Sequence, residues 1–259
     1  MPNCSQPLTL YEMSMRRERE TLNNVLACWI RMLLLSENDG IWSDSQQVEE
    51  VRNECKTVNK RLASLPRRIS DDLIHPLVPD FLNKISSHHN TFLGLGHAET
   101  EHEAVCTEML KSVLGPFTRR YDTGIMSSFE QRLVIQTFPS TPNLTVLVFR
   151  TARGIDKSAL LANNIHHLKH LVSFQYNYRC TDKVVQQLAL HCSKVRRIDV
   201  SNSPAVTDVS VQHLLTLTDL RDLDLKGTSV TERGCRLIVS GFPNINITYP
   251  SPSCDCYVM

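Results

Sequence analysis

Val195–Asp219 reads VRRIDVSNSPAVTDVSVQHLLTLTD, and Leu220–Asn244 reads LRDLDLKGTSVTERGCRLIVSGFPN. Both stretches have apolar residues at their first, fourth and sixth positions and continue through Thr-Asp or Thr-Glu into an apolar segment. Such openings start at Leu144, Leu171, Val195 and Leu220, and a weaker last unit starts at Ile245, at spacings of 27, 24, 25 and 25 residues. A fixed period in the twenties predicts a repeat protein in which each unit supplies one strand and one returning helix.

The opening of each unit alternates apolar and polar residues, which favours a strand with one buried face. Thr181, Thr207 and Thr231 each precede an acidic residue and an apolar segment. We expect these threonines to cap the N-terminus of a helix, where the acidic residue that follows is also favourable. One unit cannot bury its apolar face alone, so neighbouring units must stack into a continuous core.

Two cysteine positions in the unit that starts at Leu171 carry a family resemblance. Cys180-Thr181-Asp182 and His191-Cys192-Ser193 resemble the cysteine-containing subtype of leucine-rich repeat, which is common in F-box proteins and related ubiquitin-ligase receptors. The resemblance covers roughly residues 144–247. It implies an α/β fold, namely a short leucine-rich-repeat solenoid of about four to five repeats preceded by a mainly α-helical region.

The rest of the chain is expected to be mostly helical. We expect a helical N-terminal region over residues 1–95, a helical capping or linker region over 96–139, the repeats over 140–248 and a tail over 249–259. Apolar spacing predicts helices over 8–35, 43–65, 69–85 and 101–114, a loop over 88–96 and a mixed capping element over 115–137. Pro76 and Pro79 are expected to break the third helix into two pieces.

Composition restricts the function classes. The chain carries 28 Lys and Arg against 27 Asp and Glu, for a net charge of +1, and it has no basic run, so nucleic-acid binding is disfavoured. The apolar stretch Val25–Leu35 contains Arg31 and is too short to span a bilayer, and no signal peptide opens the chain. The nine cysteines are therefore interpreted as reduced thiols, and a cytoplasmic or nuclear location, or both, is expected.

Two short N-terminal motifs resemble the halves of a VHL box. Thr9-Leu10-x-x-x-Ser14-x-x-x-Glu18 resembles the elongin-binding half, although the family has an apolar residue where this chain has Glu18. Leu65-Pro66-x-x-Ile69-x-x-x-Leu73 resembles the cullin-binding half, and Ile69 and Leu73 share one helix face. The resemblance implies that elongin B/C and a cullin bind residues Leu10, Ser14, Leu65, Pro66, Ile69 and Leu73. Alternatively, Leu10, Ile69 and Leu73 belong to the core of a helical cap.

An F-box is the other adaptor-binding segment that fits repeats of this kind. It also begins near Leu-Pro, as at Leu65-Pro66, and it would bind an F-box adaptor in place of elongin. The Val-Cys-Lys-x-Trp-like segment that follows in an F-box is missing, since residues 86–90 read SSHHN. The VHL-box interpretation is therefore preferred.

The outward strand positions predict a binding face. They form three columns across neighbouring strands, which lie about 4.8 Å apart. The columns are Val146, Ser173, Arg197 and Asp222; Val148, Gln175, Asp199 and Asp224; and Arg150, Asn177, Ser201 and Lys226. Together with Tyr178, these positions give the candidate substrate-binding residues Arg150, Gln175, Asn177, Tyr178, Arg197, Asp199, Asp222, Asp224 and Lys226. We expect an acidic spot that takes a peptide with at least one basic residue, or an arrangement in which Arg197 and Asp222 merely neutralise each other.

The motifs give no indication of catalysis. The chain contains no G-x-S-x-G, P-loop or G-x-G-x-x-G motif, and no cofactor is expected. The segment His97-x-Glu99-x-x-His102-Glu103 lacks the spacing of a metal site. The final residues Cys256-Tyr257-Val258-Met259 fit C-a-a-X, so Cys256 is a candidate for prenylation, which would bring the chain to a membrane.

Taken together, the motifs predict a non-catalytic protein–protein interaction module. We expect the substrate-recognition subunit of a cullin-RING ubiquitin ligase, in which the N-terminal motifs bind the adaptor and the repeats bind the substrate. The alternative is a leucine-rich-repeat scaffold, tethered to a membrane if Cys256 carries a lipid, with no ligase role.

Overall fold

The computed structural model describes residues 10–35, 46–94, 99–151 and 157–249. The chain divides into two compact units, Met1–Leu114 and Gly115–Met259. The first unit is helical, and the second contains a parallel sheet with helices. The expected α/β class with a helical N-terminal region is confirmed.

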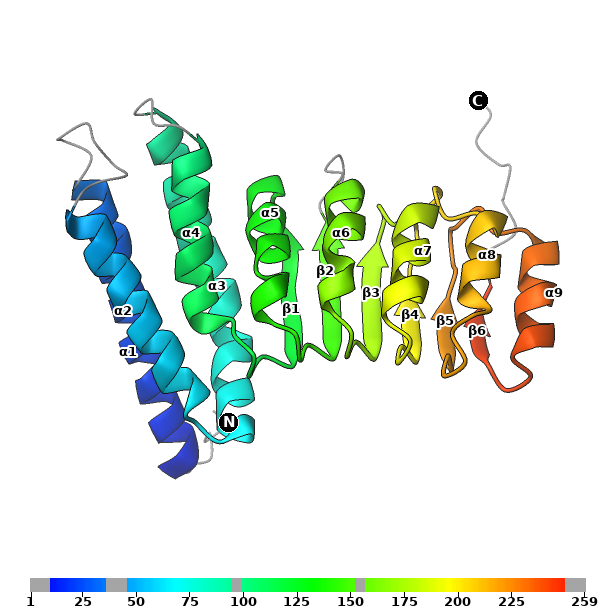
Figure 1. Ribbon diagram of the computed structural model, residues 1–259, viewed down its shortest axis with the longest axis horizontal. Coiled ribbons are helices and arrows are strands. Elements are labelled where there is room, and N and C mark those ends of the chain that lie inside the picture. The colour runs from blue at the N-terminus through cyan, green and yellow to red at the C-terminus, as the bar shows by residue number, and fades with distance from the viewer. Residues whose placement is uncertain (1–9, 36–45, 95–98, 152–156, 250–259) are drawn as a thin grey trace, which may run out of the picture. The chain divides into compact units, whose positions relative to one another are not determined.

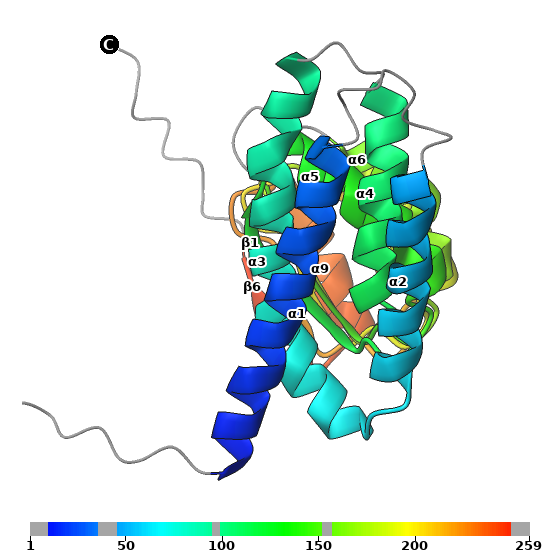
Figure 2. The same cartoon turned by 90° about the vertical axis from the view of Figure 1, so that its left-hand side faces the viewer.

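The first unit consists of four described helices (Figure 2), namely α1 (Leu10–Leu35), α2 (Gln46–Ala63), α3 (Arg67–Gly94) and α4 (Glu99–Val113). Helix α1 packs on α2 and α3, and α4 packs on α2 and α3. Their shared core is large and apolar, with Trp29, Leu62, Leu77, Phe81 and Leu110 almost fully buried. Stripes of apolar residues at helical spacing produce this packing.

Helix α3 differs from the sequence-based expectation at two places. It runs without a break through Pro76 and Pro79, and it continues to Gly94 across most of the expected 88–96 loop. The side chains of Leu73, Leu77 and Phe81 are buried on both sides of the prolines. Because packing of a long apolar face stabilises a helix more than local preference does, this face holds the helix together across both prolines.

The second unit is built on a six-stranded parallel sheet whose strand order follows the chain. The strands are β1 (Arg120–Met126), β2 (Val146–Thr151), β3 (Ser173–Asn177), β4 (Arg197–Asp199), β5 (Asp222–Asp224) and β6 (Asn246–Thr248). The helices α5 (Ser128–Gln136), α6 (Ser158–Asn164), α7 (Asp182–His191), α8 (Asp208–Leu214) and α9 (Glu232–Gly241) lie on one face of the sheet (Figure 1). The short 3-10 helices η2 (Phe138–Ser140) and η3 (Ile165–His167) follow α5 and α6.

The predicted helix caps are confirmed. Thr181, Thr207 and Thr231 are the N-cap residues of α7, α8 and α9, and each hydroxyl accepts a hydrogen bond from a backbone N–H of its helix. The inward strand residues are buried against the helices, with Phe174, Tyr176, Ile198 and Leu223 among them. Helices α7, α8 and α9 therefore begin where the sequence pattern places them.

Residues 115–137, expected to form a mixed capping element, contain strand β1 and helix α5. Strand β1 pairs in parallel with β2, so this segment adds one more strand–helix unit to the sheet. A capping box starts α5, since the Ser127 hydroxyl accepts from the Glu130 N–H while the Glu130 carboxylate accepts from the Ser127 N–H. The period does not reveal this unit because RYDTGIM lacks the apolar residues of the other openings.

Candidate functional site

The sheet face that the helices leave uncovered carries the candidate binding residues. Strand pairing aligns Ser173 with Arg197 and Asp222, and Gln175 with Asp199 and Asp224. This register is the one that the sequence columns require. A shallow depression of about 220 Å³ lies on this face between β3 and β6. Its charged lining residues are Arg197, Asp199, Asp222 and Asp224, and we name these four residues the acidic sheet face.

A hydrogen-bond network fixes the side chains at one edge of the depression. Gln175 Nε2 donates to Asn177 Oδ1 at 2.7 Å, and Asn177 Nδ2 donates to Asp199 Oδ1 at 2.7 Å and to Ser201 Oγ at 2.8 Å. The Ser201 N–H also donates to Asp199 Oδ1, at 3.0 Å. Asn177 and Ser201 are buried by these contacts. They therefore position Asp199 and are poorly accessible to a partner.

The carboxylates of the acidic sheet face accept hydrogen bonds but form no ion pair with a described residue. Asp222 Oδ1 accepts from Asn246 Nδ2 at 3.2 Å, and Asp224 Oδ1 accepts from the Lys226 N–H at 2.9 Å. No ion pair joins Arg197 to Asp222, although the two residues are paired across β4 and β5. The negative charge on this face is thus available to a cationic ligand.

Arg150 lies in a different electrostatic setting from the other candidates. Its guanidinium is 3.6 Å from Asp122 Oδ1, and Asp122 is also 3.5 Å from Arg120. Both Arg120 and Asp122 belong to β1, the strand that the sequence reasoning missed. Arg150 therefore belongs to a small ion-pair group on β1 and β2, toward the β1 edge of the sheet and away from the three half-buried carboxylates of β4 and β5.

Tyr178 follows β3 and is 47% exposed, in a left-handed backbone conformation with φ of 72°. The equivalent positions after β4 and β5 are Asn202, with φ of 56°, and Gly227, with φ of 68°. Asn and Gly tolerate this conformation, whereas for a bulky residue it is strained. An exposed aromatic ring at a strained position next to the sheet face is a candidate binding residue on physical grounds.

The first unit contains a pocket of about 260 Å³ between α1, α2 and α3, which we name the helical pocket. Its lining includes Ser14 and Glu18 from one motif and Leu65, Ile69 and Leu73 from the other. The structure therefore brings both motifs together, although they are some fifty residues apart. Leu73 is buried, Leu65 and Ile69 are half-buried, and Ser14 and Pro66 are exposed. The side chain of Leu10 is outside the described residues.

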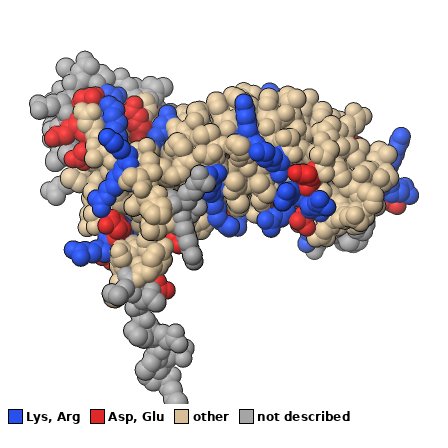
Figure 3. All heavy atoms as spheres, turned by 60° about the horizontal axis from the view of Figure 1, so that its bottom comes forward, with Lys and Arg blue, Asp and Glu red and all other residues tan. Residues whose placement is uncertain are grey.

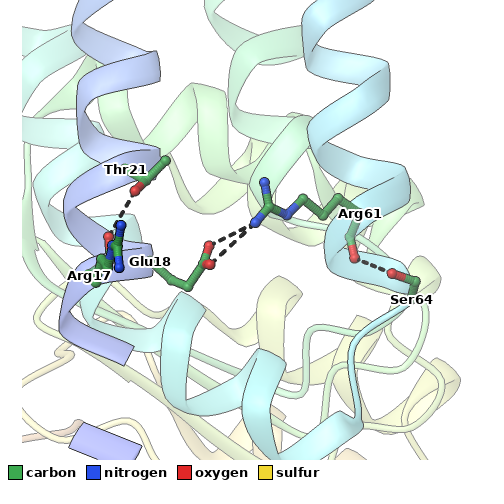
Figure 4. A network of polar contacts seen from close by, with 5 residues as sticks. All are labelled: Arg17, Glu18, Thr21, Arg61 and Ser64. Carbon is green, nitrogen blue, oxygen red and sulfur yellow. Dashed lines mark hydrogen bonds and ion pairs between the residues drawn. The ribbon is translucent and has the colours of Figure 1, made fainter. Parts of the chain in front are cut away.

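Polar contacts close one side of the helical pocket (Figure 4). Arg61 on α2 donates to both carboxylate oxygens of Glu18 on α1, at 3.3 and 3.1 Å. The Tyr11 hydroxyl donates to Asp72 Oδ2 at 2.8 Å, which joins α1 to α3. Glu18 thus has a structural partner at the position where a VHL box has an apolar residue. Such an exposed ion pair is worth about 0.2–1 kcal/mol.

Most of the described cysteines are buried, and their thiols have low reactivity. Burial raises the pKa of the Cys55 thiol to about 12, with Glu108 adding to the effect, and burial raises the pKa of Cys192 to about 12. The pKa of Cys180 and of Cys106 is raised further by the same cause. Because the thiolate is the reactive form, these cysteines are poor nucleophiles. Cys256 and His97 lie outside the described residues.

Within the described ranges, no cluster of three or more His, Cys, Asp or Glu side chains has the arrangement of a metal site. None of the described helices is long and apolar enough to cross a membrane. In comparisons with known proteins, no protein-family model matches the chain, and no curated protein matches it at a significant level.

Proposed function

We propose that this chain is a non-catalytic leucine-rich-repeat protein that recognises a substrate for a cullin-RING ubiquitin ligase. The observation that supports the proposal best is the acidic sheet face, where register, hydrogen bonds and unpaired carboxylates favour a protein segment with a basic residue. The parallel sheet in chain order, with a helix after nearly every strand and a period in the twenties, is compatible with a leucine-rich-repeat solenoid.

The ligase part of the proposal rests on the helical pocket. Ser14, Leu65 and Ile69 line one pocket and remain partly exposed, as residues that contact an elongin or a cullin must be. Leu73 is buried within the unit, so it supports the pocket from inside. A second candidate function is a leucine-rich-repeat scaffold with no ligase partner. The burial of Leu73 and the Glu18–Arg61 contact favour this alternative, because both describe a self-contained helical bundle.

A pull-down from cells tests the adaptor step. We expect the tagged full chain to recover elongin C and a cullin, and we expect Ser14→Arg to lose both because a long cationic side chain blocks close approach at the pocket. Asn24→Arg is the matched control, since Asn24 is also exposed on α1 and receives the same side chain. Recovery of the F-box adaptor in place of elongin C would mean that the chain binds its ligase through an F-box-like segment. Recovery of no adaptor would favour the scaffold without a ligase role.

The substrate step needs variants that remove charge and keep the hydrogen bonds. Asp199→Asn and Asp224→Asn keep an oxygen that accepts from the backbone N–H groups of Ser201 and Lys226. We expect the double variant to fold normally and to lose captured partners that contain basic segments. The matched control is Glu232→Gln with Glu103→Gln, which removes two charges elsewhere. Unchanged partners in the Asp199 and Asp224 double variant would contradict the role of the acidic sheet face.

A further inference from the structure

Basic side chains gather at the end of the second unit where the strands begin and the helices finish. Of the seven Lys and Arg within residues 157–198, Lys157, Arg179 and Lys183 lie at the other end, where the helices start, and the rest lie in or beside the turns before β3 and β4. Asp182 lies at the start of α7, where its carboxylate accepts hydrogen bonds from the N–H and hydroxyl of Thr207. Lys169, Lys194, Arg196 and Arg221 come from the turns before β3, β4 and β5 and are exposed. Figure 3 shows Lys and Arg side chains along this end of the second unit.

We define the basic end as these four residues together with the histidines beside them: His166, His167, His170 and His191. The rings of His166 and His167 have centroids 3.9 Å apart, and those of His166 and His191 are 5.9 Å apart. Lys194 Nζ lies 3.2 Å from His170 Nδ1. These contacts join the turn after α6 to the last turn of α7 and the turn after it, so the groups form one cluster.

The cations of the basic end lack carboxylate partners. None of Lys169, Lys194, Arg196 and Arg221 forms an ion pair with a described residue. The acidic residue of this end is Asp219, in the turn before β5. A cation near the last turn of a helix is favourable, and His191 meets that need for α7. A favourable interaction with the helix C-terminus therefore does not explain why so many basic side chains lie at this end.

We propose that the basic end binds a short acidic segment of a protein partner, at a surface separate from the acidic sheet face. Three neighbouring strands span roughly 10 Å, which corresponds to about three extended residues of a peptide. Asp219, together with Asp222 and Asp224 on the adjoining strand, would repel a longer polyanion that extended past the cations. Charge complementarity over a short length thus favours an acidic peptide over a nucleic acid.

Binding at the basic end should strengthen as the pH falls below 6.5, the ordinary pKa of an imidazole, because the pKa of His167 lies under that value. The pKa of His167 is lowered by burial, then by His166 and by Lys169, so its protonation is held back in the free protein. The charged groups around it are His166 and Lys169 on its own segment and His191, Lys194 and Arg196 from α7 and the turn that follows. An approaching carboxylate offsets their mutual repulsion and favours the protonated ring.

The test uses the full chain and a labelled oligoglutamate peptide, with fluorescence anisotropy as the readout. We expect Lys169→Gln with Lys194→Gln to weaken binding about three- to tenfold, from the loss of two exposed charge contacts. Lys157→Gln with Lys183→Gln is the matched control, because it removes the same charge from the starts of α6 and α7, and less than about a twofold change is expected there. Circular dichroism checks that both variants fold.

Two further comparisons complete the test. As the pH falls from about 6.5 to about 5.5 the wild type should bind more tightly, and His167→Gln should lose part of this gain. An equal loss of affinity in both lysine variants would mean diffuse attraction and would overturn the proposal. Tighter binding of a single-stranded oligothymidine than of the oligoglutamate would assign the site to nucleic acid and would also overturn it.

Discussion

At Tyr178 the proposed binding role and the stability of the fold would favour different residues. Its left-handed backbone costs about 1–2 kcal/mol for an L-residue with a side chain, and its ring is half exposed. Tyr178→Gly relieves the strain but gives the unfolded chain more freedom, so we expect urea denaturation to show a free energy of unfolding unchanged or up to about 1 kcal/mol higher. Captured partners should nevertheless be lost. A clear loss of stability would mean that the ring packs on the fold.

Gly227 supplies the matched measurement for Tyr178, because it occupies the equivalent position after β5. A Cβ there would lie 3.1 Å from Asn202 Oδ1 and 3.2 Å from Asn202 Cα, and φ is 68°. Gly227→Ala should therefore lower the free energy of unfolding by about 1–2 kcal/mol. If Gly227→Ala were neutral, the strain assigned to Tyr178 would be overstated as well.

The buried thiols make a prediction about alkaline pH. In the folded chain, burial holds the pKa of Cys55 and Cys192 at about 12, against an ordinary value of 9.0. Their contribution to stability is complete below about pH 9 and is lost as the pH rises toward about 12, because only the unfolded thiols ionise between these values. Alkylation followed by mass spectrometry at mildly alkaline pH should modify the exposed Cys28 rapidly and the buried pair slowly. Rapid labelling of Cys192 would contradict its burial.

At the scale of single elements, helix α3 carries the clearest test. Proline inside a helix costs about 3 kcal/mol relative to Ala, and α3 accepts two of them. Pro79→Ala should raise the free energy of unfolding of the first unit by about 1–3 kcal/mol, because it restores a donor to the helix. Tryptophan fluorescence follows the unfolding of the first unit, because both tryptophans of the chain, Trp29 and Trp42, precede Leu114. Lower stability would instead show that the pyrrolidine ring of Pro79 fills a packing site.

The same elements show how far the sequence alone could reach. Period and alternation were enough for β2 to β6, for the caps Thr181, Thr207 and Thr231, and for the columns of the sheet face, because each unit repeats one local pattern. Strand β1 was missed because it lacks that pattern and is held by its pairing with β2. The sequence pattern also did not predict the helical pocket, because Ser14 and Ile69 line the same pocket only once α1 packs on α3.

At the scale of the second unit, Asp182 and Asp208 each join one strand–helix repeat to the next. Asp208 accepts hydrogen bonds from the Thr231 N–H at 2.7 Å and from its hydroxyl at 2.6 Å, as Asp182 does from Thr207. A Cβ on Gly234 would meet Asp208 Oδ1 at 2.4 Å, whereas the equivalent Ser210 donates its hydroxyl to Asp182. In these two repeats one carboxylate thus positions the cap of the following helix.

This arrangement predicts graded opening of the second unit from its C-terminal end. Among the described helices, α8 packs mainly on α7 and α9, and α9 packs mainly on α8, so the last described repeat has a helical neighbour on one side. Amide hydrogen exchange should be slowest in β3 and α7 and fastest in β6 and α9. Asp208→Ala should speed exchange mainly in α9 and β6, whereas Asp182→Ala should speed it through α8 and everything after it, because each leaves the next cap without its acceptor. Equal acceleration across all repeats in both variants would show that the unit opens as one cooperative body, and the carboxylates would then act on the whole sheet.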